Sequence, residues 1–441
     1  MILNGILGTL ASLSFFLTLW QWLVAWRFPL HRRSADLQIG ANQAGAPSNA
    51  PNRTSALHPP VTLLKPLKGC DAPTEACLRS WFTQDYAGEI QILLAVADPN
   101  DPVCPVVKKL IAEFPHHDAQ LLVCPERLGA NAKVSQLAQL EPHLRHEIIV
   151  ISDADVRVPV DLLANVVAPL SLAPVTAGAS PRALNAPTVC ADSRRRLPAV
   201  GLVNCFYQLA NPTTLAMRWE AIAINADFWS QVLQSQSLQP LDFALGAVMA
   251  TRRKQLTEIG GFRALADCLA DDYQLGHRIA KHGHHIELCP VVVECWSSPM
   301  NWGAVWRHQL RWARTVRVCQ PLPYFFSILS NATFWPLIWI LVSLPPLLVQ
   351  TPAVSGSATV AGAAASLPIL LGLGFLAARV LTAALLHRRL THRRIGLGAP
   401  LLVPLKDLAQ VVVWAGAFLG NRIEWRGERY RLHRDGNLSQ E

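Results

Sequence analysis

A long part of the chain alternates short apolar runs with stretches of mixed polarity. Four of the runs are strand-like, being rich in β-branched and other apolar residues, and cover residues 61–65, 91–97, 120–123 and 147–152. The segments between them, including 74–82 and 105–113, are long enough for crossover helices. Strands that alternate with helices in this way are typical of a doubly wound parallel sheet. The pattern therefore predicts an α/β domain, and the apolar residues 241–249 indicate a further buried strand.

Longer apolar runs lie outside this alternating region. Residues 2–26 carry no charge and are long enough to span a bilayer, and 321–350 and 357–386 each supply a further span. Arginines follow the first and the last of these runs, so the positive-inside rule places both of those ends in the cytoplasm. A fourth apolar segment, 400–420, contains Lys406 and Asp407. We interpret it as re-entrant or interfacial, because a span there would carry the basic tail outside.

These runs divide the chain into successive segments. Residues 27–60 are rich in Ala, Asn, Pro and Ser, which is typical of a flexible tether. Tryptophans and arginines interleave over 302–317, which indicates an amphipathic helix at a membrane surface. The arginines of this helix could also clamp a diphosphate leaving group, and the two interpretations are compatible. The predicted order is a transmembrane helix (1–26), a cytosolic tether (27–60), an α/β domain (61–300), an interfacial helix (301–320), two transmembrane helices (321–386), a basic loop with a re-entrant or interfacial helix (387–421) and a basic cytosolic tail (422–441).

Composition supports a membrane protein. Charged residues make up only 16%, against about 25% in a typical soluble domain. The net charge is +9, but the basic residues lie beside the apolar segments, which favours an anionic membrane surface over a nucleic acid partner. The ten cysteines are scattered without the paired spacing of a zinc site or a disulfide framework. That pattern favours a reducing, cytosolic setting.

The strongest candidate site follows the apolar run 147–152, which leads directly into Asp153 and Asp155. Ligands of open α/β sheets bind beyond the carboxyl ends of the strands. Two carboxylates at positions i and i+2 of such a turn can both face one hard cation. Mg²⁺ or Mn²⁺ held this way usually completes its shell with substrate phosphates. The alternative is that both acids merely cap the next helix.

Other strand ends bring further polar residues to the same edge. Lys65 ends the first strand, where it could meet a phosphate or remain an ordinary surface lysine. Asp98 could accept hydrogen bonds from a base or a ribose, or it could cap the turn-forming residues 99–102. Lys133 is suited either to a local loop contact or to a phosphate.

A second acidic pair, Asp271 and Asp272, precedes apolar positions with helical spacing. Acids at such a place are expected to cap a helix and to interact favourably with its dipole. Two adjacent acids can also divide the roles, so that one caps the helix and the other acts as a general base. The residues alone leave both interpretations open.

The order of these motifs resembles the membrane-bound glycosyltransferases of family 2 type, and within them the ceramide glucosyltransferase-like group. The resemblance covers nearly the whole chain after the tether. It rests on Leu63-Leu-Lys-Pro-Leu-Lys-Gly69, Asp98, Gly129-Ala-Asn-Ala-Lys133, Asp153, Ala270-Asp-Asp272-Tyr, Gln309-Leu-Arg311-Trp312 and Trp425-Arg-Gly-x-Arg-Tyr-Arg431.

The resemblance implies a GT-A (Rossmann-like) catalytic domain, with one N-terminal and about two to three C-terminal transmembrane or membrane-embedded helices. It also implies inverting transfer of a single sugar from a UDP-sugar to a lipid hydroxyl, with a divalent metal as cofactor. The implied roles are nucleotide-sugar binding by Lys65, Asp98, Lys133 and Asp153, metal binding by Asp153 and Asp155, general base by Asp272 with Asp271 beside it, and closure over the donor by His308 or Gln309 with Arg311 and Trp312.

The acceptor region departs from the ceramide enzymes. Between residues 204 and 252 no acceptor-site histidine matches, and residues 242–253 resemble the bacterial hopanoid-associated branch. That branch implies UDP-N-acetylglucosamine and bacteriohopanetetrol in a bacterial inner membrane, whereas the ceramide group implies UDP-glucose and a sphingolipid. A processive polysaccharide synthase shares the same motifs, but it needs more spans to enclose a channel. A non-enzymatic membrane scaffold leaves the acids at the strand and helix ends unexplained.

Overall fold

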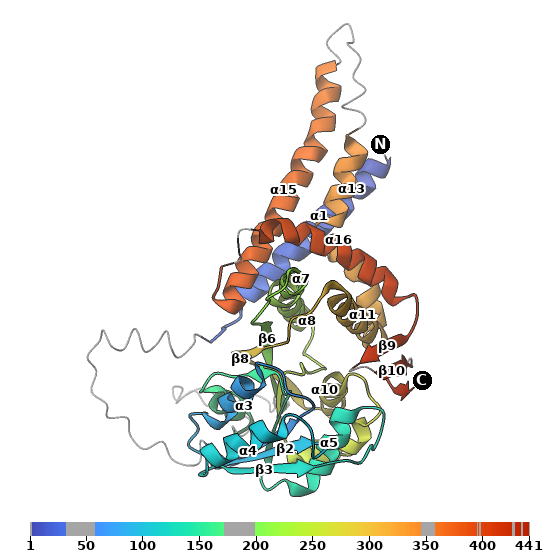
Figure 1. Ribbon diagram of the computed structural model, residues 1–441. Coiled ribbons are helices and arrows are strands. Elements are labelled where there is room, and N and C mark those ends of the chain that lie inside the picture. Colours follow the sequence, from blue (N-terminus) through green and yellow to red (C-terminus); the bar gives the residue numbers. More distant parts are fainter. Residues whose placement is uncertain are drawn as a thin grey trace, which may run out of the picture. The chain divides into compact units, whose positions relative to one another are not determined.

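A computed structural model describes residues 2–31, 58–171, 199–344, 358–394, 396, 398–425, 428–433 and 435–440 (Figure 1). They belong to two compact units. The helical unit comprises Met1–Pro29, Gln208–Gln239 and Pro299–Glu441, and the sheet unit comprises Leu30–Tyr207 and Pro240–Ser298. Most of the predicted tether lies outside the described residues. The predicted domain boundaries stay predictions, and the sequence did not indicate that Gln208–Gln239 belongs to the helical unit.

The sheet unit contains an eight-stranded mixed sheet of order β3-β2-β1-β4-β7-β6-β8-β5. Its first half is parallel, because β1 pairs in parallel with both β2 and β4, and β2 pairs in parallel with β3. These strands are β1 (Val61–Pro66), β2 (Ile90–Val96), β3 (Asp118–Val123) and β4 (Ile148–Ser152). All four coincide with predicted strands, and the α/β class is confirmed.

The second half of the sheet corrects the prediction of an all-parallel sheet. β7 (Val248–Arg252) runs antiparallel to β4 and to β6 (Val200–Leu209), and β5 (Val156–Arg157) runs antiparallel to β8 (His285–Cys295). The strand predicted over 241–249 begins only at Val248. Residues 241–247 form an irregular segment whose leucines are buried, and an apolar run alone does not distinguish a buried loop from a strand.

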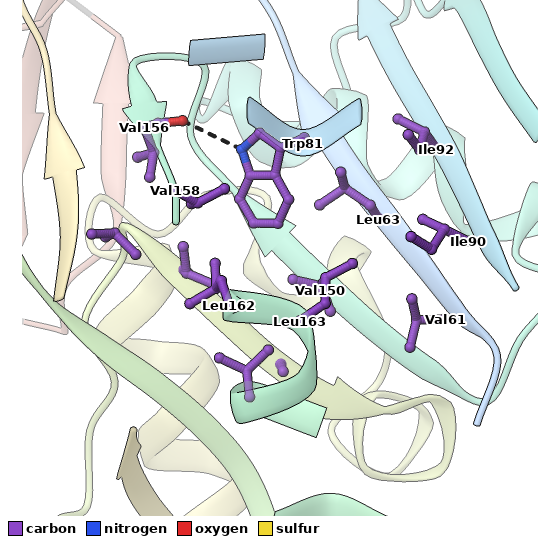
Figure 2. Packing of buried hydrophobic residues seen from close by; sticks show 14 of the residues in the cluster. Val61, Leu63, Trp81, Ile90, Ile92, Val150, Val156, Val158, Leu162 and Leu163 are labelled. Carbon is purple, nitrogen blue, oxygen red and sulfur yellow. Dashed lines mark hydrogen bonds between the residues drawn. The ribbon is translucent and has the colours of Figure 1, made fainter. Parts of the chain in front are cut away.

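Helices cover the sheet and complete its core. They are α3 (Thr74–Phe82), α4 (Cys104–Glu113), α5 (Ala132–Leu140), α6 (Leu162–Ser171), α9 (Arg253–Glu258) and α10 (Asp271–Lys281). Figure 2 shows Trp81 of α3 among Leu63, Val150 and Leu163, with its indole Nε1 donating to the carbonyl of Val156 at 3.3 Å. Such close packing fixes the strand ends, and therefore the loops that follow them.

The helical unit is built around α1 (Ile2–Arg27), α13 (Phe334–Ser343) and α15 (Ala358–Thr391), which contact one another (Figure 1). Among the described residues, two helices are long and apolar enough to cross a membrane, α1 and the Ser366–Thr391 part of α15. A third span is possible if Pro321–Ser330 and Phe334–Ser343, which are bent by 45°, act as one. The predicted span over 321–350 is therefore broken in its described part, up to residue 344.

Contacts at both of its ends hold α1. The side-chain oxygen of Asn4 accepts a hydrogen bond of 2.6 Å from the indole of Trp339 on α13. At the other end, the guanidinium of Arg389 on α15 donates to the last carbonyl groups of the helix region, which belong to Ala25, Trp26 and Phe28. Terminal carbonyl groups of a helix lack intrahelical partners, so Arg389 satisfies them in place of water.

A buried ion network joins four segments of the helical unit. Arg379 of α15 lies 2.8 Å from Asp407 and 3.0 Å from Asp227, and Lys406 pairs with the same two acids. Asp227 lies on a π-helical turn, Ala223–Phe228, between α7 (Leu215–Ile222) and α8 (Trp229–Leu238), while Lys406 and Asp407 belong to α16 (Ala399–Ala417). The hydroxyl of Thr333 also donates to Asp407, at 2.6 Å.

The network explains how α16 carries two charged residues. Each of the four charged side chains is at most 10% exposed, and the two cations match the two anions. A buried charge is tolerated only when it is paired and hydrogen-bonded. α16 is not among the described helices that qualify as membrane spans. The re-entrant or interfacial interpretation of this segment stays a prediction.

Candidate active site

Asp153 and Asp155 follow β4 at the carboxyl end of the parallel half of the sheet. All five residues of β4 are buried, whereas the Asp153 side chain is 37% exposed and Asp155 is exposed. The chain turns here into the short β5, so neither acid caps a helix directly. The buried strand thus delivers two carboxylates to the surface at the edge where ligands of α/β sheets bind.

Lys65 supports this loop from the interior. Its side chain is 1% exposed, and its ammonium donates to the backbone carbonyl of Asp153 and, at 3.3 Å, to the hydroxyl of Ser152. It also lies 5.1 Å from the ring centre of Trp81. Burial lowers the pKa of Lys65 to about 8, against the opposing effect of the Asp153 and Asp155 carboxylates. The ammonium group of Lys65 is thus hydrogen-bonded within the protein, to Ser152 and Asp153. A contact between Lys65 and a phosphate stays a prediction.

Lys133 links the two acidic motifs. Its ammonium lies 2.7 Å from Oδ1 of Asp153 and 2.9 Å from Oδ2 of Asp271, and the side chain is only 9% exposed. Burial alone would lower the pKa of Lys133, but the carboxylates of Asp153 and Asp271 outweigh burial and raise it. The lysine therefore stays charged and holds the loop after β4 to the first turn of α10.

Asn131 fixes the position of Lys133. It is the N-cap of α5, where its side-chain oxygen accepts from the backbone N–H of Val134 at 3.2 Å. Its amide nitrogen donates to the carbonyl of Cys268 at 2.9 Å and to Asp271 at 3.4 Å. The fully buried Asn131 thus anchors α5 beside the acidic pair. The sequence placed Asn131 within a motif but did not predict this role.

Asp271 and Asp272 occupy the first turn of α10, where they have different partners. Asp271 pairs with Lys133, whereas Oδ1 of Asp272 accepts from the adjacent backbone N–H of Tyr273 at 2.8 Å. Burial first, and then the charge of Asp271, raise the pKa of Asp272 to about 6, while Lys133 acts in the opposite direction. A carboxylate with a pKa near neutrality is suited to general base catalysis.

Gly246 gives the Asp272 carboxylate its space. A Cβ atom at residue 246 would lie 2.7 Å from Oδ2 of Asp272, closer than van der Waals contact permits. The irregular segment before β7 can therefore approach Asp272 only because residue 246 has no side chain. This close approach was not predicted, because residues 241–247 were expected to form a strand.

Asp98 lies apart from this cluster in its described contacts. It follows β2, is exposed, and accepts from the backbone N–H of Asn100 at 2.8 Å. That contact is the local turn interaction considered as the alternative for this residue. The neighbouring Asp101, which the sequence did not single out, accepts from the N–H groups of Gly69 and Val103 and so joins the loops after β1 and β2. Nucleotide binding by Asp98 stays a prediction.

The predicted closing motif lies in the helical unit, on α11 (Trp302–Cys319). His308 Nδ1 and Gln309 Nε2 both contact one oxygen of Glu220, at 2.7 and 2.9 Å. Glu220, on α7, is 1% exposed, and its second oxygen has no hydrogen-bond partner among the described residues. The sequence missed Glu220, because a single acid in a helix carries no motif. The structure thus gives His308 and Gln309 a common partner.

The remaining two motif residues face different surroundings. The ring of Trp312 is tilted against that of His308, with ring centres 4.7 Å apart, and against that of Phe228, with ring centres 6.1 Å apart. Arg311 lines a cavity together with other arginines of α11. The closing motif on α11 belongs to the helical unit, whereas Lys133 and the two acidic pairs belong to the sheet unit.

The loop that contains Asp153 and Asp155 can hold a divalent cation only if a bound substrate supplies further metal ligands. Among the described residues, no group of three or more His, Cys, Asp or Glu side chains gathers in a way that could hold a metal ion. Asp153 and Asp155 therefore supply two carboxylates at most. Mg²⁺ commonly binds through one or two carboxylates plus substrate phosphates and water, which is compatible with this pair.

Several known proteins are similar to this chain. The family model described as Glycosyl transferase family 21 matches residues 10–186 and 188–438. Ceramide glucosyltransferase of Candida albicans is 37% identical over 122 residues, which cover 25% of this chain and 22% of that protein. Ceramide glucosyltransferase 3 of Caenorhabditis elegans is 24% identical over 228 residues, or 51% of this chain and 44% of that protein. The chain thus matches less than half the length of these relatives.

A solved structure of a mannosyltransferase from Pyrobaculum calidifontis in complex with GDP-Man and Mn²⁺ is also similar. It is 22% identical, with 91% of this chain and 99% of that chain covered, and the TM-score is 0.42. With a TM-score of 0.42, this similarity supports no conclusion beyond the match of the family model.

Proposed function

Since this chain belongs to Glycosyl transferase family 21, we propose that it transfers a single sugar from a UDP-sugar to a hydroxyl group of a membrane lipid. The donor is UDP-N-acetylglucosamine or UDP-glucose, and the acceptor is a hopanoid such as bacteriohopanetetrol, or a ceramide. The ceramide glucosyltransferases similar to this chain support a lipid acceptor. The observation that carries the proposal is the ammonium of Lys133, which bridges Asp153 and Asp271 beside the carboxylate of Asp272.

In the proposed reaction, Asp272 accepts the proton of the lipid hydroxyl. The resulting oxygen nucleophile forms a bond to the anomeric carbon of the sugar, and the bond from that carbon to the diphosphate breaks with its electron pair going to UDP. Attack opposite to the leaving group inverts the anomeric centre. Lys133 holds Asp271 and Asp153 so that base and donor loop keep a fixed spacing, which lowers the entropic cost of reaching the reactive geometry.

Asp153 and Asp155 would hold a divalent cation together with the donor diphosphate. A bound Mg²⁺ or Mn²⁺ supplies charge stabilisation to the departing UDP. The exposed carboxylate of Asp155 and the partly exposed carboxylate of Asp153 are accessible for this purpose.

We place the enzyme in the inner membrane of a bacterium with its catalytic unit in the cytoplasm. The apolar helices α1 and α15 support membrane anchoring. Arg27 follows α1, and Arg388 and Arg389 lie in the last turn of α15, so the positive-inside rule assigns these ends to the cytoplasm. UDP-sugars and the lipid surface would then meet on one side of the bilayer.

The proposal is tested by incubating the purified full-length protein in detergent with Mg²⁺ or Mn²⁺. UDP-glucose and UDP-N-acetylglucosamine are offered separately against ceramide and bacteriohopanetetrol, and the lipid products are analysed by mass spectrometry. The expected result is one sugar added to one acceptor class. A polymer of sugars, or no glycolipid with any pair, contradicts the proposal.

The transfer rate will depend on the protonation of Asp272. Protonated Asp272 cannot accept a proton, so kcat is expected to be constant at neutral pH and to fall on the acid side with a midpoint near pH 6. Lys133→Met removes the charge that lowers the pKa of Asp272, and the midpoint should move upward. The measurement is kcat as a function of pH. The control is Lys281→Met, which removes an exposed positive charge at the other end of α10, the helix that carries Asp272. A midpoint that moves downward in Lys133→Met would show that Asp272 is not the titrating base.

Gly246→Ala will displace the proposed base without removing it. The new Cβ atom needs the space of Oδ2 of Asp272, so the carboxylate must shift. A misplacement of about 1 Å can cost on the order of 10²-fold in rate, and we expect kcat to fall by up to roughly that factor. The KM for the donor should change little. Gly374→Ala is the control, because a Cβ atom there meets nothing within 4 Å. Equal kcat values for the two variants would contradict the prediction.

A further inference from the structure

Glu220 is a buried acid of the helical unit that the proposed reaction leaves without a role. It lies on α7 and is only 1% exposed. Nδ1 of His308 donates to Oε1 of Glu220 at 2.7 Å, and Nε2 of Gln309 donates to the same oxygen at 2.9 Å. Oε2 of Glu220 has no hydrogen-bond partner among the described residues. One oxygen thus serves two neighbouring residues of the closing motif, while the other is buried without a donor.

This arrangement is more than the packing of two helices requires. Burial of a carboxylate disfavours folding unless hydrogen bonds satisfy both of its oxygens. A glutamine at position 220 could accept from His308 and Gln309 through one oxygen, and it would join α7 to α11 without a buried carboxylate. A buried polar atom that the fold leaves unsatisfied calls for a specific explanation, and service to a functional site is one. Glu220 is therefore a candidate for a role in the site.

The packing of α7 against α11 makes Glu220 a fixed acceptor. Trp219, the neighbour of Glu220, belongs to one buried apolar cluster with Val305 of α11. At the start of α7, the hydroxyl of Thr214 donates to the carbonyl of Met300 at 2.7 Å. Contacts on both sides of Glu220 thus hold its helix to the segment that carries the closing motif. The carboxylate has little freedom to follow a side chain of the motif that moves away.

The two motif residues that meet Glu220 differ in what remains of them. Gln309 is 5% exposed, and its amide group donates into the interior. His308 is 27% exposed. Because a carboxylate oxygen only accepts, Nδ1 of His308 carries a hydrogen, and Nε2 is the ring nitrogen that remains for a ligand. The tilted ring of Trp312, 4.7 Å away between ring centres, restricts rotation of the imidazole further.

From these contacts we infer that Glu220 is a positioning residue of the transfer reaction, which acts by orienting His308. The inference rests on the proposed function, and it divides the roles of two residues that the sequence left undistinguished. Gln309 joins α11 to α7, whereas His308 presents Nε2 to the UDP-sugar. A hydrogen bond to a carboxylate is stronger than one to a neutral oxygen, so it holds the ring more firmly. A ring that is oriented in advance loses less entropy when it meets the donor.

A double-mutant cycle separates positioning from packing. The four full-length proteins in detergent are the unaltered chain, Glu220→Leu, His308→Ala and the double variant, and kcat and KM for the UDP-sugar are measured by glycolipid formation. We expect each single variant to lower kcat/KM for the donor about 10-fold, as loss of a hydrogen bond to a charged group commonly does. The double variant should be no less active than His308→Ala. Glu220→Gln retains an acceptor oxygen and should lose less activity than Glu220→Leu.

Thr214→Val is the control for loosened packing, because it removes the hydrogen bond from α7 to Met300 and leaves the closing motif unaltered. It should lower the midpoint of thermal unfolding and keep kcat/KM near that of the unaltered chain. If Glu220→Leu does not fold, the same cycle is measured with Glu220→Gln. Additive losses in the double variant, or full activity of the Glu220 variant, overturn the inference. An unaltered protein that forms no glycolipid contradicts the proposed function itself, so the two failures are distinguishable.

Discussion

Asp272→Asn is expected to reduce sugar transfer by about 10²–10⁴-fold, the contribution typical of a positioned general base. The amide has almost the shape of the carboxylate and can still accept from the N–H of Tyr273 at its oxygen, so the first turn of α10 should be retained. Because the change removes a proton acceptor and leaves the loop after β4 intact, the affinity for the UDP-sugar should stay close to that of the unaltered protein. Transfer is measured by product formation and donor affinity by calorimetry.

Two further variants are needed to interpret this result, one that alters donor binding and one that serves as a control. Asp153→Ala should lower donor affinity itself, since it removes a carboxylate from the proposed metal–diphosphate site and a partner of Lys133. Asp267→Asn is a matched control, because Asp267 accepts from the N–H of Ala130 at 2.9 Å and an amide oxygen can do the same. Unchanged turnover in Asp272→Asn would eliminate Asp272 as the base. Normal donor affinity in Asp153→Ala would count against the metal role.

Arg379→Met should destabilise the protein by about 3–5 kcal/mol, the usual effect of removing one partner from a buried ion pair. The substitution leaves Asp227 and Asp407 with Lys406 as the only cation of the network, in surroundings where water cannot replace the lost charge. The midpoint of thermal unfolding in detergent should fall by roughly 10 °C. Arg388→Met, at an exposed position of the same helix, should have little effect.

A double substitution tests whether the four charged groups are coupled energetically or whether each variant only loses its own contacts. Arg379→Met/Asp407→Asn removes one cation and one anion, so the remaining Lys406–Asp227 pair is neutral. If the four groups act as a unit, the double variant will be less destabilised than the sum of the single variants. Strict additivity would mean that the charges do not interact energetically.

The features of the fold and the site that are encoded in one short stretch of sequence were predicted correctly. The apolar run of β4 ends at Asp153, so the same residues that predict the strand also place the acid at the sheet edge. Likewise, the helical spacing after Asp271 predicted α10, and the structure begins that helix at Asp271. Such features are local, and a short stretch of sequence contains all the information that they require.

The features that the sequence did not reveal depend on contacts between distant segments. Glu220 meets His308 across 88 positions, and Asn131 meets Asp271 across 140. The antiparallel half of the sheet was missed because β6 and the segment around Gly246 lack a clear alternation of polar and apolar residues. In such stretches tertiary packing, rather than local propensity, decides the conformation.

The attachment of α1 has a consequence for the integrity of the polypeptide. Asn4 and the carbonyl groups at the end of the helix are held by Trp339 and Arg389, which come from the opposite end of the chain. The first helix is therefore connected to its unit by two routes, one covalent and one through these contacts. A single cut of the backbone between residues 31 and 58 would break the covalent route and leave the contacts of Trp339 and Arg389 in place. The N-terminal peptide, which contains α1, would then remain bound as a separate polypeptide. The protein could therefore be assembled from two fragments that are produced independently.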